Sequence, residues 1–279
     1  MLTGQPSRTA QGAALHRAFH QMNDTPPILR DPWAVKIIGP EAEDALRSGE
    51  EWHAQPSATA LRAVIVTRSR FAEDCLAERY AKGIRQYVLL GAGLDTFAYR
   101  NDFAGLRVFE TDFPATQVWK RERVSAMGAD ASPEASYAPV DFEHETIVEG
   151  LQRADFDFAK PAVFAWLGVT MYLTPETVFA TLRLVQQRMA NGSEIVFDFS
   201  VTPKDDAGRA RRAVFAERAA AIGEPVKSDF VPDDLKAAVR ALGFAEVQVL
   251  GPRELNARYF AGRSDGFALT RGHLLRARV

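Results

Sequence analysis

The chain has 279 residues, of which 47% are hydrophobic and 25% are charged, as in an ordinary globular protein of one or two domains. Its 34 lysines and arginines nearly balance 36 aspartates and glutamates, which excludes a general electrostatic attraction to nucleic acid or to an anionic membrane. No apolar run is long enough to span a membrane, residues 1–11 lack a signal-peptide core, and the single cysteine, Cys75, excludes an internal disulfide, so we expect a cytoplasmic protein.

Residues 1–85 are predicted to be mostly helical. Asp31 and Pro32 suit the N-cap and first turn of a helix, and residues 58–81 place apolar side chains at helical spacing. From residue 86 onward, strand-like apolar runs alternate with helical stretches. The predicted strands are Tyr87–Gly91, Arg107–Thr111, Ser136–Val140, Ala162–Leu167, Glu194–Phe199, Ala245–Leu250 and His273–Val279.

The clearest helices of the second half are Pro175–Ala190 and Pro232–Leu242, whereas the polar, arginine-rich stretch Thr202–Gly223 is predicted to be a lid. Alternation of strands and helices predicts an α/β fold with a doubly wound, Rossmann-like sheet. Because the last two strands lie close together in sequence, we expect a late hairpin that makes the sheet mostly parallel with one antiparallel strand.

We expect a single domain made of four parts. These are an N-terminal helical cap (1–85), a cofactor-binding core (86–200), a lid insertion (201–230) and a segment that closes the sheet (231–279).

A glycine turn follows the first predicted strand, in the run L-G-A-G-L-D-T over residues 90–96. Gly91 and Gly93 allow the backbone to turn with little bulk beside a ligand. A dinucleotide site has a third glycine next to the pyrophosphate, and Thr96 occupies that position here. S-adenosylmethionine has no phosphate, so the turn favours this cofactor, although a turn shaped only by packing is an alternative.

Acidic residues end the next two predicted strands. Asp112 lies about twenty positions after the turn, where a carboxylate can accept both ribose hydroxyls. It can also cap the helix that Pro114 opens, and both roles can hold at once, although the spacing favours the ribose. Glu110 is a weaker second candidate for the ribose. At the end of the third strand, Asp141 can accept from the adenine amino group while Phe142 covers the ring. A surface acid that starts the next helix is an equal alternative for Asp141.

These stretches resemble a known family. The matching segments are R-S-R-F at 68–71, Q-Y-V-L-L-G-A-G-L-D-T-F-A-Y-R at 86–100, F-E-T-D-F-P-A-T-Q-V-W-K-R-E-R at 109–123, P-V-D-F at 139–142 and W-L-G-V-T-M-Y-L-T at 166–174. Over about residues 30–200 the chain resembles the leucine carboxyl methyltransferase family, in particular its bacterial branch of O-methyltransferases linked to polyketide and secondary metabolism. The resemblance implies a class I methyltransferase fold, S-adenosylmethionine as the cofactor and methylation of an oxygen atom. A late antiparallel strand is also typical of that fold and unusual in dehydrogenases.

The resemblance also implies roles for single residues. Arg68 would pair with the methionine carboxylate of the cofactor, which suits a bidentate guanidinium, although a solvated helix face is the alternative. Asp112 would hold the ribose. The remaining cofactor-binding positions implied are Gly91, Ala92 and Gly93 beside methionine and ribose, and Asp141 and Phe142 beside adenine.

Two positions depart from the family pattern. Leu167 stands where many relatives carry an acid near the amino group of the methyl donor, and Phe97 stands where many carry arginine. The departures affect the amino-acid end of the cofactor and leave the adenosine contacts intact.

The acceptor is expected to be a small molecule. The sulfonium methyl is already activated, so catalysis is chiefly alignment, and a carboxylate acceptor would need no general base whereas a phenol would. Tyr172 and the lid residues Arg209 and Arg212 are candidates for orienting the acceptor, with a solvated helix face as the alternative for the arginines.

No metal is expected, because His16 and His20 share a helix face without a third ligand. Two other functions stay open. A nicotinamide-dependent oxidoreductase would use the same glycine turn and acid, and Leu167 is compatible with a non-catalytic protein on a methyltransferase fold. The sequence predicts neither the acceptor nor the oligomeric state.

Overall fold

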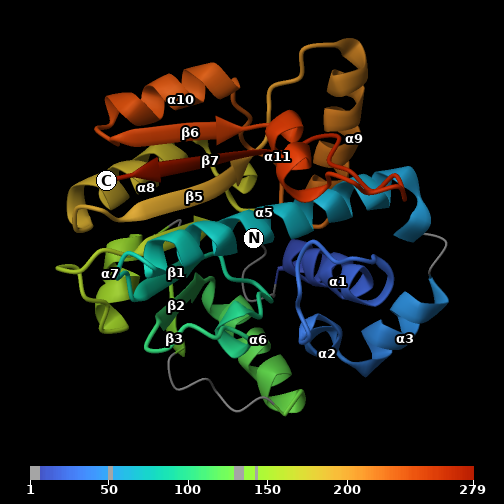
Figure 1. The fold of residues 1–279 in the computed structure, drawn as a ribbon, viewed down its shortest axis with the longest axis horizontal. Helices are drawn as coiled ribbons and strands as arrows, with labels where there is room; N and C mark the ends of the chain where they lie inside the picture. The colour runs from blue at the N-terminus through green and yellow to red at the C-terminus, as the bar shows by residue number, and fades with distance from the viewer. Residues whose placement is uncertain (1–6, 50–52, 129–134, 142–143) are drawn as a thin grey trace.

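In a computed structural model, which describes residues 7–49, 53–128, 135–141 and 144–279, the strands form one seven-stranded sheet (Figure 1). The strands are β1 (Gln86–Leu90), β2 (Arg107–Asp112), β3 (Ala135–Pro139), β4 (Val163–Trp166), β5 (Glu194–Phe199), β6 (Glu246–Leu250) and β7 (His273–Arg278). Their order in the sheet is β3-β2-β1-β4-β5-β7-β6. Strands β1 to β5 are parallel, and β7 is antiparallel to both β5 and β6, which confirms the predicted strands and the single antiparallel one.

The helices also follow the prediction closely. They are α1 (Arg8–Asn23), α2 (Ala34–Ile38), α3 (Pro40–Ser48), α5 (Pro56–Tyr80), α6 (Pro114–Ala126), α7 (Ile147–Arg153), α8 (Pro175–Arg188), α9 (Asp206–Ala221), α10 (Pro232–Ala241) and α11 (Pro252–Tyr259), with short 3-10 turns η1 (Phe97–Tyr99) and η2 (Thr170–Tyr172). The predicted helix start at Asp31–Pro32 is wrong, because α2 begins at Ala34 and Trp33 is its N-cap. The last two strands are not joined by a tight hairpin, since α11 lies between them.

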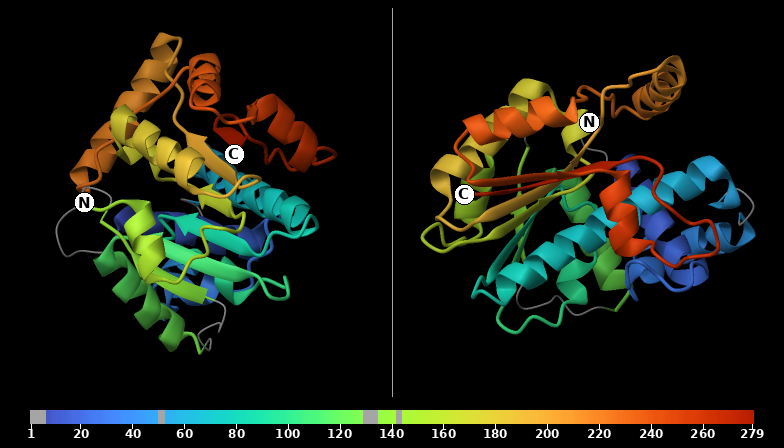
Figure 2. Two further views of the ribbon diagram at one scale, coloured as in Figure 1. Left: turned by 90° about the vertical axis from the view of Figure 1, so that its left-hand side faces the viewer. Right: turned by 45° about the horizontal axis from the view of Figure 1, so that its top comes forward.

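Both faces of the sheet are covered by helices. Successive side chains of a strand point to opposite faces, so the apolar residues of β1 pack against helices on both sides. Tyr87 and Leu89 of β1 pack on the side of α5 and α11, whereas Val88 and Leu90 pack on the side of α7, α8 and α10. Figure 2 shows these helices on either side of the twisted sheet. Among the described helices, none has the length and apolar character that crossing a bilayer would require.

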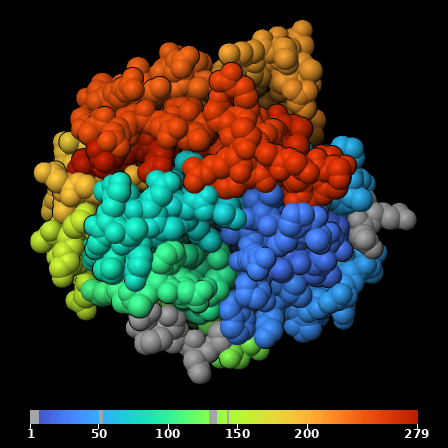
Figure 3. Space-filling model, viewed as in Figure 1, coloured from blue at the N-terminus to red at the C-terminus, as the bar shows by residue number. Residues whose placement is uncertain are grey.

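Segments distant in sequence meet across α5. In the space-filling view, residues near α11 lie against α5 and the N-terminal helices (Figure 3). Leu255 of α11 and Phe260 belong to the same buried cluster as Phe71 of α5. The Arg263 side chain donates to the carbonyl oxygen of Pro26, at 2.5 Å. The C-terminal part of the chain thereby fixes the N-terminal helices beside the sheet.

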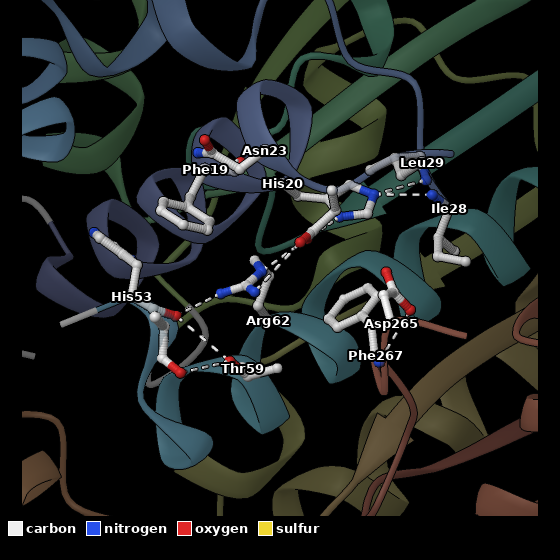
Figure 4. A network of polar contacts seen from close by, with 12 residues as sticks. Phe19, His20, Asn23, Ile28, Leu29, His53, Thr59, Arg62, Asp265 and Phe267 are labelled. Atoms are coloured by element: carbon white, nitrogen blue, oxygen red, sulfur yellow. Dashed lines mark hydrogen bonds and ion pairs between the residues drawn. The ribbon is translucent and has the colours of Figure 1, made fainter. Parts of the chain in front are cut away.

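The N-terminal helices are tied to α5 by the buried side chain of Arg62 (Figure 4). Its guanidinium donates to Asp24 Oδ2, at 2.8 Å, and to the carbonyl oxygen of His53, at 2.9 Å. Asp24 Oδ2 lies 2.6 Å from His20 Nδ1, and His20 Nε2 accepts from the Ile28 N–H. Both ring nitrogens of His20 are therefore engaged in holding the chain between α1 and α2.

Helix α9 projects from the body of the molecule, at the upper right of Figure 1. Asp205 caps its N-terminus by accepting from the Gly208 N–H, at 2.6 Å. Its two connecting segments pair at the base, where the Phe230 N–H donates to the Ser200 carbonyl and the Thr202 N–H donates to the Phe230 carbonyl. The chain thus leaves the sheet after β5, passes through α9 and returns at Phe230 beside the end of β5.

Candidate functional site

The glycine turn begins directly after β1, at the edge of the sheet where the parallel strands end. Gly91 and Gly93 have φ angles of +73° and +49°, a conformation that favours glycine. A Cβ atom on Gly91 would overlap the Val169 side chain, and one on Gly93 would lie 2.9 Å from Cβ of Ala10 in α1. Glycine is therefore needed here for both backbone conformation and packing. The packing alternative accounts for both glycines, and a role in binding stays a prediction.

Asp112, at the end of β2, is bound to that turn. Its Oδ2 accepts from the Gly93 N–H, at 2.6 Å, and its Oδ1 accepts from the Phe113 N–H, at 2.7 Å. Burial raises the pKa of Asp112 to about 6, against the lowering effect of these two hydrogen bonds. The helix-cap alternative is wrong, because the N-cap of α6 is Phe113 and no side chain caps that helix.

Asp141 lies at the end of the neighbouring strand, β3. The Val140 N–H donates to the Asp112 carbonyl, at 2.9 Å, so Asp112 and Asp141 come from adjacent strand ends. Asp141 does not cap the next helix, because Thr146 caps α7. Phe142 lies outside the described residues.

Arg68, on α5, forms an ion pair at the ends of β4 and β5. Its Nη1 lies 3.1 Å from Oδ2 of Asp198, in β5, and Asp198 Oδ1 accepts from the Gly168 N–H, at 2.5 Å. A Cβ atom on Gly168 would lie within 2.7 Å of the guanidinium carbon, so this glycine gives room to Arg68. Arg68 is thus no solvated helix-face residue. Sequence reasoning missed Asp198, although an acid inside the apolar run I-V-F-D-F was a signal.

The N-terminus of α1 covers this edge of the sheet and is held by Glu224, which follows α9. The Glu224 carboxylate accepts from the backbone N–H of Arg8, at 2.9 Å, and from the side chains of Ser7 and Thr9. The Ser7 N–H also donates to the hydroxyl of Thr116, at 3.3 Å. The segment after α9 therefore meets the N-terminus of α1, and Ala10 of α1 lies against Gly93 of the glycine turn. No local sequence pattern predicted this contact.

Tyr172, in η2, belongs to the same group of residues. Burial and the negative charge of Glu224 raise the pKa of its phenol to about 12, with Arg68 and Asp198 also acting on it electrostatically. The Lys227 N–H donates to the carbonyl oxygen of Met171, at 2.8 Å, which joins the segment after α9 to η2. The structure thus brings Tyr172, Arg68 and Glu224 together.

Thr96, at the position of the third glycine, has a structural role of its own. Its hydroxyl donates to Oδ1 of buried Asp31, at 2.7 Å. Asp31 also pairs with Arg17 of α1, at 3.4 Å, and with Arg100, at 3.6 Å. These contacts fix the turn to the N-terminal helices. Asp31 Oδ1 also accepts from the Trp33 N–H, at 3.2 Å, so Asp31 lies at the entry to α2 although it is not the N-cap.

The two lid arginines are placed differently. Arg209 pairs with Asp206 at 2.5 Å on the surface of α9, where the arginine side chain is 56% exposed. Arg212 lies closer to the base and pairs with Asp229 at 3.3 Å, with its side chain 21% exposed. Arg209 therefore lies on a solvated helix face, as the alternative predicted. Arg212 is less exposed and contacts Asp229, outside α9.

Three other residues that the sequence singled out are placed as follows. Glu110 is buried and pairs with Lys120 of α6, at 2.7 Å, so it does not reach the glycine turn as Asp112 does. Phe97, one of the two positions that depart from the resemblance, is packed edge-on against Tyr87 in the core. Among the described residues, no group of potential metal ligands includes His16.

Comparison with known proteins gives a family match. The leucine carboxyl methyltransferase family profile matches residues 10–186. A Bacillus subtilis protein named "Putative S-adenosyl-L-methionine-dependent methyltransferase YktD" is 29% identical, over 96% of each chain. A Saccharopolyspora erythraea protein named "Putative S-adenosyl-L-methionine-dependent methyltransferase" is 32% identical, over 68% of this chain and 66% of its own.

Solved structures agree on the fold. The crystal structure of a protein titled a putative methyltransferase, from Thermobifida fusca, superposes with a TM-score of 0.60. The match covers 99% of this chain and 96% of the other at 18% sequence identity, so it is evidence for a shared fold alone.

Proposed function

The chain belongs to the leucine carboxyl methyltransferase family, and we propose that it methylates an oxygen atom of a small acceptor molecule. It is an S-adenosylmethionine-dependent methyltransferase, as its relatives are named. The family match gives the oxidoreductase alternative no support.

The residues at the strand ends fit the adenosine half of S-adenosylmethionine. The observation that carries this assignment is the buried Asp112 carboxylate, held at the glycine turn by the Gly93 N–H. Both oxygens keep acceptor capacity beyond their two backbone hydrogen bonds, as a pair of ribose hydroxyls requires. We propose that Asp112 binds the ribose, that Gly91, Ala92 and Gly93 line it, and that Asp141 and Phe142 bind adenine.

The bound cofactor supplies an activated methyl group, so the protein has to align the acceptor and exclude water. Because its pKa is raised to about 12, the Tyr172 phenol stays protonated near neutral pH and is a hydrogen-bond donor there, not a base. A donor at this position suits an acceptor carboxylate, which is already ionised and needs no base. We therefore propose that Tyr172 orients the acceptor, and that Arg212, more than the exposed Arg209, adds positive charge for it.

The acceptor chemistry is tested with S-adenosylmethionine that carries tritium in its methyl group. Purified protein is incubated with a metabolite extract of its source, and the labelled products are treated with mild base. Methyl esters hydrolyse and release volatile tritiated methanol, whereas methyl ethers and methylamines retain the label. With wild type, we expect label that mild base releases as volatile methanol. With Tyr172→Phe, we expect this label to be reduced about tenfold or more. Base-stable label would contradict a carboxylate acceptor.

A further inference from the structure

The strand-four motif comprises residues 166–174, from the end of β4 onward, and contains no acidic residue. Leu167 stands where the family resemblance implies an acid for the ammonium group of the methionine moiety. Leu167 packs against the apolar cluster on the α5 side of the sheet. An ammonium group taken out of water needs a compensating anion or several acceptors, since burying an unpaired charge is costly. The question is which group of this chain supplies that anion.

Asp198 is the acid that lies beside the same motif. Its backbone is in β5, next to β4 in the sheet, and Trp166 of β4 is paired in register with Phe197. Its side chain crosses to the strand-four motif, where Oδ1 accepts from the Gly168 N–H, at 2.5 Å. Only 5% of the Asp198 side chain is exposed, so its charge is poorly screened by solvent. The carboxylate of Asp198 thus binds the backbone of Gly168, the residue that follows Leu167.

The Arg68–Asp198 pair has bonding capacity to spare. Within the described part of the chain, Arg68 donates one side-chain hydrogen bond, from Nη1 to Asp198 Oδ2 at 3.1 Å. A guanidinium has five N–H donors and a carboxylate about four acceptor positions. Arg68 can therefore keep its partner and still bind a second carboxylate, while Asp198 can still accept from an ammonium group.

An amino acid is the ligand that matches such a pair, because it carries one ammonium and one carboxylate on the same carbon. Its two charges can lie antiparallel to those of Arg68 and Asp198, so that each of the four groups has an opposite neighbour. The pair also acts electrostatically on Tyr172, which joins it to the site above.

We propose that Asp198 binds the ammonium group of the methionine moiety of S-adenosylmethionine while Arg68 binds its carboxylate. The acid that the strand-four motif lacks is thus supplied by β5. This inference rests on the proposed function, and it assigns Asp198 a role in cofactor specificity.

The test is calorimetric binding of two ligands to wild type and Asp198→Asn. S-adenosylhomocysteine carries the amino-acid moiety, and 5′-methylthioadenosine has the same adenosine without it. We expect Asp198→Asn to weaken S-adenosylhomocysteine roughly 10- to 100-fold, as loss of a charged hydrogen bond does, and to change 5′-methylthioadenosine less than about twofold. Glu194→Gln is the matched control, because Glu194 is also a buried acid of β5 and pairs with Arg276, at 2.9 Å. It should leave both affinities within about twofold.

The outcomes separate the inference from the function. Wild type that binds neither ligand would refute the proposed function itself. If wild type binds both ligands, the function stands. If Asp198→Asn then loses affinity for both ligands equally, or for neither, only the role of Asp198 is overturned. If the variant does not fold, the deaminated analogue of S-adenosylhomocysteine is titrated into wild type. A loss of affinity below about twofold would then show that no anion meets the ammonium group, and would overturn the proposal.

Discussion

Asp112 is a carboxylate kept in a place that disfavours its charge. It is buried, and its pKa is raised to about 6 even though two backbone N–H groups donate to it. Lys120 offsets part of the burial effect, and Glu224 adds to it. Hydrogen bonds donated to the charged form of a buried carboxylate favour that form, and ribose hydroxyls would donate such bonds.

This shift predicts a pH dependence of binding. Ribose hydroxyls donate to the ionised carboxylate, so affinity should fall as Asp112 takes up a proton below its pKa of about 6. Between about pH 8 and about pH 5, we expect the dissociation constant of 5′-methylthioadenosine to rise about tenfold, since about a tenth of the carboxylate stays ionised at the lower pH. This ligand has no amino acid that titrates or meets Asp198. Calorimetry across this range measures the effect, and Asp112→Asn should bind more weakly without the same slope. A flat profile in wild type would contradict the assignment.

Residues at strand ends were predictable from the sequence, and those that depend on distant contacts were not. Asp112 and Asp141 follow apolar runs directly, so their place at the sheet edge follows from the pattern. Asp198 sits inside an apolar run, and its partner is seen only in the structure, where Arg68 of α5 pairs with it. Glu224 contacts a helix more than two hundred residues away, a pairing on which local periodicity carries no information.

At the scale of elements, the N-terminus of α1 is bound by the segment after α9. A carboxylate at the N-terminus of a helix satisfies free backbone N–H groups and interacts favourably with the helix dipole. Here Glu224 provides that carboxylate from the lid segment, at 2.9 Å from the Arg8 nitrogen. We propose that this contact holds α1 over the cofactor and couples it to the lid.

Removal of the charge should loosen α1 without altering the sheet. In Glu224→Gln, we expect faster amide hydrogen exchange in the first turn of α1 and a loss of S-adenosylhomocysteine affinity of about two- to tenfold, the range expected for a weakened helix cap. Hydrogen–deuterium exchange measured by mass spectrometry reports the first effect and calorimetry the second. Glu217→Gln, at an exposed position of α9, is the control and should change neither. Exchange in α1 identical to wild type would show that Glu224 does not anchor the helix.

The elements themselves were largely predictable because each carries its own signal. Thr174 and Pro175 begin α8, and the side chains of Val178, Leu182 and Val185 face the core as their spacing predicts. The start of α2 was misplaced by a few residues. The Asp31 carboxylate binds Thr96, two arginines and the Trp33 N–H, and none of these contacts caps the first turn of α2 at Ala34. Tertiary contacts thus override a local preference where a buried ion-pair network forms.

At the scale of the whole molecule, the two ends of the cofactor are assigned to different parts of the sheet. The proposed adenosine contacts lie at the ends of β1, β2 and β3, and the proposed amino-acid contacts at β4 and β5. Segments from both ends of the chain cover this edge, since α1 and the residues after α9 meet there. We propose that residues 86–200 form the cofactor-binding core, with 1–85 as cap, 201–230 as lid and 231–279 completing the sheet.

The most direct test of this account is equilibrium binding of S-adenosylmethionine to the full chain, by calorimetry near neutral pH, with thermal unfolding as the check on folding. We predict saturable binding of one cofactor per chain, weakened about tenfold or more in Asp112→Asn, which removes the charge that accepts the ribose hydroxyls. A folded wild-type chain that does not bind S-adenosylmethionine, or a folded Asp112→Asn variant that binds it equally well, would contradict the account.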